Sequence, residues 1–146
     1  MTVRQNQHFI IRPFQPSDQD AAKHLVLGGL SERFKPLRPE LSTDVDDIQN
    51  NFDIFLVVCQ GEKLIATGGL TFISDNTAKV VRMSTAKAFR NQGVASKVLE
   101  ELETQAKQKA ITRLTLVTGQ NWTDALRFYE RHGFQAVDTY RDETGF

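Results

Sequence analysis

A predicted strand, a glycine-containing loop and a predicted helix follow one another in residues 80–110, and the rest of the chain is organised around them. Residues 80–85 are apolar and rich in β-branched side chains, which is typical of a strand. Beyond them, Val94, Val98, Leu102 and Ala106 recur every four residues, so they lie on one face of a helix. Gly93 lies between the two segments.

The start of this predicted helix carries no acidic side chain. Helices usually have Asp or Glu in their first turn, yet the first acid here is Glu100, well inside the helix. The free backbone N–H groups and the positive end of the helix dipole therefore have no negative side chain beside them. Gly93 would let a ligand approach the backbone closely. The pattern favours a bound phosphate, although a glycine that serves only a tight strand-to-helix turn explains Gly93 equally well.

Composition excludes several classes of function. The 146 residues carry no formal net charge, which argues against charge-driven binding to nucleic acid or an anionic membrane. No apolar run approaches the roughly 20 residues of a membrane span, and the polar start lacks a signal-peptide core, so we expect a cytoplasmic protein. Cys59 is the single cysteine and lies in an apolar run. It predicts a buried thiol and excludes an internal disulfide or a cysteine metal cluster, and we expect no metal.

The order of predicted elements indicates one α+β domain over residues 1–146. A strand at 9–13 precedes a helix that Gly28 and Gly29 end or loosen, then an irregular stretch at 31–42 and a short helix from 43. Three antiparallel strands follow at 52–59, 64–72 and 80–85; after the long helix come a strand at 113–118, parallel to 80–85, a helix at 123–132 and a strand at 134–138. Gly68 and Gly69 indicate a bulge or a close approach of another backbone.

Two motifs on these elements carry a resemblance to a known family. The first is Arg90, Gly93 and Ala95 in the loop and helix start; the second is Asn121, Ala125, Tyr129 and Gly133-Phe134. The chain resembles the GCN5-related N-acetyltransferase (GNAT) superfamily over nearly its whole length. The resemblance implies a mixed, mostly antiparallel sheet with helices on both faces. Its central parallel strand pair would splay apart to hold an acyl-CoA.

The resemblance also implies roles for individual residues, with acetyl-CoA as the co-substrate. Tyr129 would be the general acid that protonates the departing thiolate, although a packed aromatic on an apolar helix face is the alternative. A backbone N–H near residues 83–85 would polarise the thioester carbonyl. The residues implied in binding acetyl-CoA are Met83, Ser84, Thr85, Arg90, Asn91, Gln92, Gly93, Val94, Ala95, Ser96, Asn121 and Ala125.

The general base and the acceptor pocket are less defined. Many relatives place a glutamate in or before the strand at 80–85, but residues 77–83 contain no acid. Candidate bases are Asp75, Glu32 and His24, and a desolvated amine could also react through water alone. The acceptor pocket would be lined by loop 31–42, the turn at Asp75 and the tail after Tyr140. The candidate substrate residues are Glu32, Arg33, Arg38 and Asp75. The two arginines would bind a carboxylate or phosphate on the acceptor, although arginines of a solvated loop are an equally good explanation.

We therefore expect an acetyl-CoA-dependent N-acetyltransferase that acts on a primary amine of a small molecule. The alternatives are a transferase of the same fold that acts on a protein or peptide amine, and a non-catalytic acyl-CoA-binding sensor. The family's sheet commonly closes with one more strand after 134–138, and only residues 139–146 remain for it. Either that strand is stunted or a second copy completes the edge in a homodimer.

Overall fold

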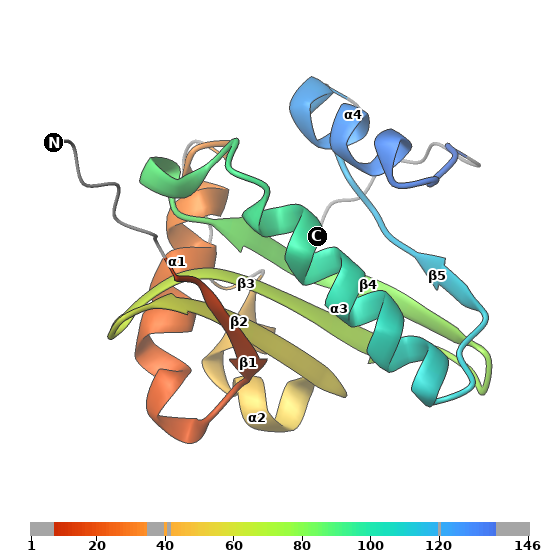
Figure 1. The fold of residues 1–146 in the computed structure, drawn as a ribbon, viewed down its shortest axis with the longest axis horizontal. Helices are drawn as coiled ribbons and strands as arrows, with labels where there is room; N and C mark the ends of the chain where they lie inside the picture. The colour runs from red at the N-terminus through yellow and green to blue at the C-terminus, as the bar shows by residue number, and fades with distance from the viewer. Residues whose placement is uncertain (1–7, 35–39, 41, 120, 137–146) are drawn as a thin grey trace, which may run out of the picture.

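A computed structural model describes residues 8–34, 40, 42–119 and 121–136 of the chain. Its centre is a five-stranded sheet in the order β1-β2-β3-β4-β5 (Figure 1). The strands are β1 (Ile10–Pro13), β2 (Ile54–Gln60), β3 (Lys63–Phe72), β4 (Thr77–Thr85) and β5 (Arg113–Thr115), and the α-helices are α1 (Gln19–Ser31), α2 (Ile48–Asn51), α3 (Val94–Gln108) and α4 (Thr123–Arg131). β1 to β4 pair antiparallel, and β4 pairs parallel with β5, as predicted.

Helices cover both faces of this sheet and form two cores. On the face in front in Figure 1, α3 buries Val98, Leu99 and Leu102 against Leu56 and Ile65 of the strands. On the other face, α1 and the segment around α2 pack against β2 through a second cluster: Ala22, Val26, Val45, Ile48, Phe55, Val57 and Cys59. Cys59 is therefore a buried thiol, as predicted. The mixed sheet with helices on both faces confirms the predicted fold class.

Helix α1 runs through Gly28 and Gly29 to Ser31, so the prediction that these glycines end the helix is wrong. The structure gives a packing reason for one of them. A Cβ at Gly29 would lie 3.2 Å from the hydroxyl of Ser84 in β4, whereas a Cβ at Gly28 would meet nothing within 4 Å. Gly29 thus lets α1 approach β4 closely, and the residues after α1 are carried to the end of that strand.

β4 and β5 pair only where they begin. The paired residues are Thr77–Lys79 and Arg113–Thr115, and the structure assigns no further pairing between the two segments. An irregularity in the pairing of β3 with β4 lies farther along, where Arg82 has a φ of 51°. Gly68 lies opposite this irregularity, so the predicted bulge is confirmed; a Cβ there would overlap the Val98 side chain of α3, so the close approach at this glycine is by side chains and not by another backbone. Beyond the first pairs, β4 and the segment after β5 are not paired with each other.

The predicted last strand is only partly described. Residues 134–136 are not in a strand, and residues 137–146 lie outside the described part of the chain. The stunted strand and the homodimer therefore stay predictions. In the described ranges, no helix combines the length and the apolar character that crossing a bilayer requires.

Candidate functional site

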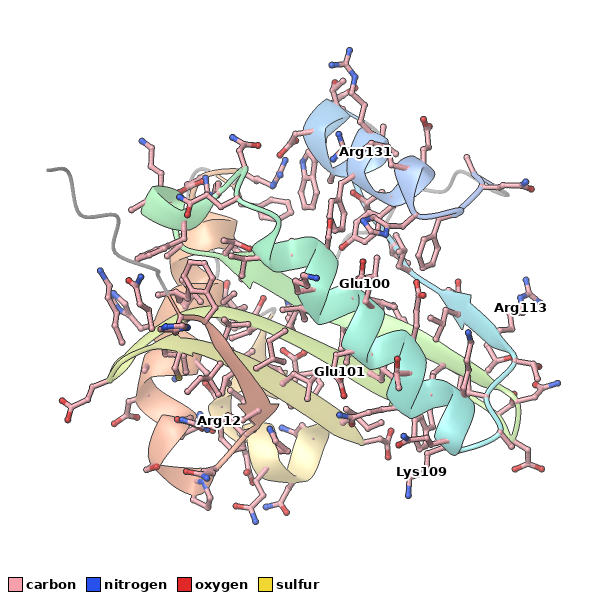
Figure 2. All side chains as sticks on the ribbon, viewed as in Figure 1. Arg12, Glu100, Glu101, Lys109, Arg113 and Arg131 are labelled. Carbon is pink, nitrogen blue, oxygen red and sulfur yellow. The ribbon has the colours of Figure 1, made fainter. Side chains whose placement is uncertain are left out.

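The loop before α3 has the geometry of an anion site. Gly93 is the N-cap of α3 with a φ of 80°, and Asn91 also has a positive φ, of 62°. No side chain caps the helix, and its first turn contains no acid. Figure 2 places Glu100 on α3 well beyond that first turn. A Cβ at Gly93 would meet no atom within 4 Å, so the space outside the loop is open. The exposed N–H groups and the helix dipole together favour a phosphate here.

Arg90 fastens this loop to two neighbours. Its Nε donates to the carbonyl of Thr85 at the end of β4, at 3.0 Å. Its two Nη groups donate to the carboxylate of Glu32 just after α1, at 2.8 and 3.1 Å. The hydrogen bonds from Arg90 lower the pKa of Glu32. Glu32, a candidate base, is therefore held ionised beside the loop, and this pairing makes it a weaker proton acceptor.

Two segments that are not paired with each other follow the first pairs of β4 and β5. On one side are Met83, Ser84 and Thr85, the last residues of β4. On the other side the chain runs on from β5 to Asn121, which is exposed. The hydroxyl of Thr118 in this segment is buried, and within the described ranges it is the one such side-chain atom without a hydrogen-bond partner. The backbone edges here have no paired strand, and the Thr118 hydroxyl has no partner. Both features suit an elongated polar ligand that lies between the strands.

Tyr129 is positioned by the way α4 ends. Gly133 has a φ of 88°, its N–H donates to Glu130, and the N–H of Phe134 donates to the carbonyl of Tyr129 at 3.0 Å. These bonds form a Schellman motif, whose usual apolar contact is the edge-on packing of the Phe134 ring against Tyr129, with 5.7 Å between centroids. The ring of Phe128 also packs edge-on against Tyr129, at 5.1 Å. Burial raises the pKa of Tyr129 to about 12.

Two contacts fix α4 on the rest of the molecule. Arg33, after α1, donates to both carboxylate oxygens of Asp124 at 3.2 and 2.7 Å, and its guanidinium carbon lies 4.4 Å from the ring centroid of Trp122. At the other end of α4, the His132 ring is 3.0 Å from the hydroxyl of Ser96 in the first turn of α3. Helix α4 is therefore connected both to the residues after α1 and to the first turn of α3. Ala125 of α4 is half-buried.

The structure separates some of the other predicted residues from this region. Asp75 lies in the turn between β3 and β4, at the end of the sheet opposite the loop before α3 (Figure 1). His24 is exposed on α1. Arg38 lies outside the described residues. Glu32 and Arg33 do lie at the site, but each is engaged by a partner from another element.

Sequence reasoning missed a third ion pair, which lies farther back along β4. Arg82, at the irregularity in β4, donates through Nε and Nη2 to Asp44, at 2.9 and 2.8 Å. The Arg82 side chain is only 7% exposed and that of Asp44 is 35% exposed. Thr67 of β3 donates to the carbonyl of Arg82 at 2.8 Å and so holds the strained residue. Arg82 is a charged residue in a mostly apolar strand, and this was the one sequence signal that could have indicated the ion pair.

Potential metal ligands are scattered over the described part of the chain. Across those residues, no group of three or more His, Cys, Asp or Glu side chains comes together in a way that could hold a metal ion.

Comparison with known proteins agrees with this architecture. The family model described as "Acetyltransferase (GNAT) family" matches residues 23–134. The chain is 30% identical over 126 residues to the uncharacterized N-acetyltransferase YedL of Escherichia coli (strain K12), and the alignment covers 84% of this chain and 79% of the relative. Its fold is similar to that of a GNAT acetyltransferase from Staphylococcus aureus Mu50, with a TM-score of 0.83, 20% identity and coverage of 90% of this chain and 87% of the other.

A further similar structure is that of the PaiA N-acetyltransferase from Thermoplasma acidophilum in complex with coenzyme A. It has a TM-score of 0.78 and 20% identity, and the alignment covers 94% of each chain. At this identity the structures establish a shared fold, and the family model spans most of the chain. The chain belongs to the GNAT family of acetyltransferases.

Proposed function

We propose that this protein transfers an acetyl group from acetyl-CoA to a primary amine of a small molecule. One observation carries the proposal: the acid-free N-terminus of α3, opened by Gly93, follows the end of β4, and β4 pairs with β5 only at Thr77–Lys79. That arrangement suits a long ligand with a phosphate at one end. The structural relative from Thermoplasma acidophilum, which is described in complex with coenzyme A, supports the same ligand class.

The residues for holding acetyl-CoA follow from the site. Backbone amides of residues 92–96 would bind the pyrophosphate, with Arg90 and Asn91 shaping the loop. Backbone groups of Met83, Ser84 and Thr85 would bind the pantetheine arm from one side, and Asn121 from the other. The unpartnered hydroxyl of Thr118 fits the same arm. When bound, acetyl-CoA supplies a thioester carbonyl that an amine can attack.

Tyr129 would donate a proton to the departing sulfur. A phenol with a pKa near 12 is fully protonated at neutral pH, as an acid must be before the reaction. A backbone N–H of residues 83–85 would stabilise the negative charge on the carbonyl oxygen. The acceptor amine would lose its proton to water, since Glu32 is engaged by Arg90. The absence of net charge supports a small acceptor over a highly charged macromolecule.

The test is thiol release from acetyl-CoA in the presence of a panel of small primary amines. We expect at least one amine to be acetylated, and Tyr129→Phe to lower kcat by about 100-fold while acetyl-CoA binding is unchanged. Tyr140→Phe, which removes the hydroxyl of the other tyrosine in the chain, is the matched control and should keep the native kcat.

Other results point elsewhere. Tight acetyl-CoA binding without turnover on any amine would favour the acyl-CoA sensor. Acetylation confined to peptide or protein amines would favour the transferase that acts on macromolecules. Full activity of Tyr129→Phe would remove the tyrosine from the mechanism.

A further inference from the structure

Arg33 is held in a fixed place by two different interactions with the start of α4. Its guanidinium binds the carboxylate of Asp124 through both Nη groups and also covers the face of the Trp122 ring, at 4.4 Å from the centroid. The ring of Phe34, the next residue, packs edge-on against Trp122, at 5.6 Å. The Arg33 side chain is 30% exposed, whereas that of Asp124 is 74% exposed. The cation is therefore the more covered member of the pair, and both of its contacts limit its rotation.

The same side of α4 carries Tyr129. Trp122, Leu126 and Tyr129 are spaced four and three residues apart, which places them on one face of the helix. Arg33 covers the ring of Trp122, at the start of this face. In the described part of the chain, Arg33 is the one charged residue that shifts the pKa of Tyr129, which it lowers against the larger effect of burial.

We propose that Arg33 is a positioning residue for acetyl transfer: its guanidinium, fixed by Asp124 and Trp122, places a positive charge beside Tyr129 and favours proton transfer from this phenol to the leaving sulfur. The inference rests on the proposed function of Tyr129 as the general acid. It gives Arg33 a different task from the acceptor binding that the sequence suggested.

The charge matters because the proton transfer creates a phenolate. The acetyl carbon forms a bond to the amine nitrogen and loses its bond to sulfur, and the sulfur electron pair takes up the phenol proton. Solvent receives the proton that the amine loses and returns one to Tyr129. A nearby cation stabilises the transient negative oxygen more than it stabilises the neutral phenol. Of the other charged groups on α4, Asp124 binds Arg33 directly and offsets part of its charge, whereas Arg127, Glu130 and Arg131 are exposed.

A purely mechanical role for Arg33 makes a different prediction. If the ion pair only ties α1 to α4, loss of either partner should have the same effect. If the positive charge is what matters, loss of Arg33 and loss of Asp124 should differ, because Asp124→Asn leaves the cation stacked on Trp122. A role in binding an anionic acceptor would instead change the KM of that acceptor.

The test measures the acidity of Tyr129 directly. The chain has two tyrosines, so a Tyr140→Phe background leaves Tyr129 as the single one. A fluorinated, more acidic tyrosine incorporated there can be titrated by 19F NMR while the protein stays folded. We expect Arg33→Met to raise its pKa by about one unit and to lower kcat by up to about tenfold, since a general acid passes on only part of its pKa change to the rate. Arg33→Lys should keep most of the native value, and Asp124→Asn should leave the pKa unchanged or lower it.

Kinetics with the best amine of the panel complete the test. Arg33→Met should lower kcat with both KM values within about twofold, a change too small to report lost binding. An unchanged fluorotyrosine pKa in Arg33→Met, or an equal loss of kcat in Asp124→Asn, would overturn the proposal, and so would a raised acceptor KM at native kcat. Failure of the general acid itself is recognised separately, because Tyr129→Phe would then keep native activity whatever the titration of Arg33→Met shows.

Discussion

Tyr129 has a closely packed ring and a hydroxyl that keeps its proton. Its ring is held between Phe128 and Phe134, and its hydroxyl remains protonated far above neutral pH because burial disfavours the phenolate. The Schellman motif at Gly133 fixes both the end of α4 and the position of Phe134. Gly133 and Phe134, just after the helix, thus determine the surroundings of Tyr129, the proposed acid.

The pKa of Tyr129 has a consequence for the pH dependence of the reaction. A group with a raised pKa keeps its proton below that value and loses it as the pH rises through it. With a pKa of about 12, Tyr129 stays a competent acid throughout the usual assay range. We expect kcat to rise with pH as the acceptor amine becomes neutral and then to stay level up to pH ~10, with no decline. Steady-state kinetics from neutral pH up to that limit measure this. A decline near pH ~8 that Tyr129→Phe abolishes would contradict the assignment.

At the scale of elements, the position of α1 determines what reaches the site. Gly29 allows the helix to lie close to Ser84 of β4. The residues that follow the helix then meet two different elements, since Glu32 binds the loop before α3 and Arg33 binds α4. A small residue near the end of α1 therefore affects the geometry at both sides of the proposed acetyl-CoA site.

The two glycines of α1 offer a matched comparison. Gly28→Ala is expected to stabilise the protein by about 0.5–1 kcal/mol, because alanine favours the helix and its Cβ meets no atom within 4 Å. Gly29→Ala places a Cβ 3.2 Å from the Ser84 hydroxyl, so we expect it to be less stable than Gly28→Ala by about 1 kcal/mol. Urea unfolding gives both free energies. Equal stabilisation by the two substitutions would show that α1 does not press on β4 at Gly29.

The sequence predicts elements better than it predicts contacts between them. The periodic face of α3 and the parallel arrangement of β5 both follow from local patterns, and the structure has each of them. The predicted end of α1 is wrong because a glycine kept for close packing has the same local signature as a glycine that ends a helix.

The partners of the charged residues could not be predicted in the same way. Arg33 and Asp124 are 91 positions apart in the chain, and Arg90 and Glu32 are 58 apart. Nothing local distinguishes an arginine that will bind a carboxylate on a distant element from one that faces water. These pairings exist only once α1, α3 and α4 have packed on the sheet.

At the scale of the whole molecule, three different parts of the chain supply the site. The meander supplies the end of β4, the crossover helix α3 supplies an uncapped N-terminus, and α4 supplies Tyr129. Pairing of β4 with the chain around β5 is limited to Thr77–Lys79, so the last residues of β4 have no partner strand on that side. Binding of acetyl-CoA should therefore depend on the open loop at Gly93, which is the claim that connects the fold with the proposed activity.

Calorimetric titration with acetyl-CoA tests that claim most directly, with Gly93→Glu compared against Gly61→Glu. Both glycines have a positive φ, of 80° and 60°, and a Cβ added at either would meet no atom within 4 Å, so the two substitutions add similar strain and the same charge. Gly61 lies in the hairpin between β2 and β3 and not in the loop before α3. We predict a Kd of about micromolar order for the native protein and for Gly61→Glu, and a loss of at least about tenfold for Gly93→Glu. Equal affinity of the two variants, or no binding by the native protein, would contradict the account.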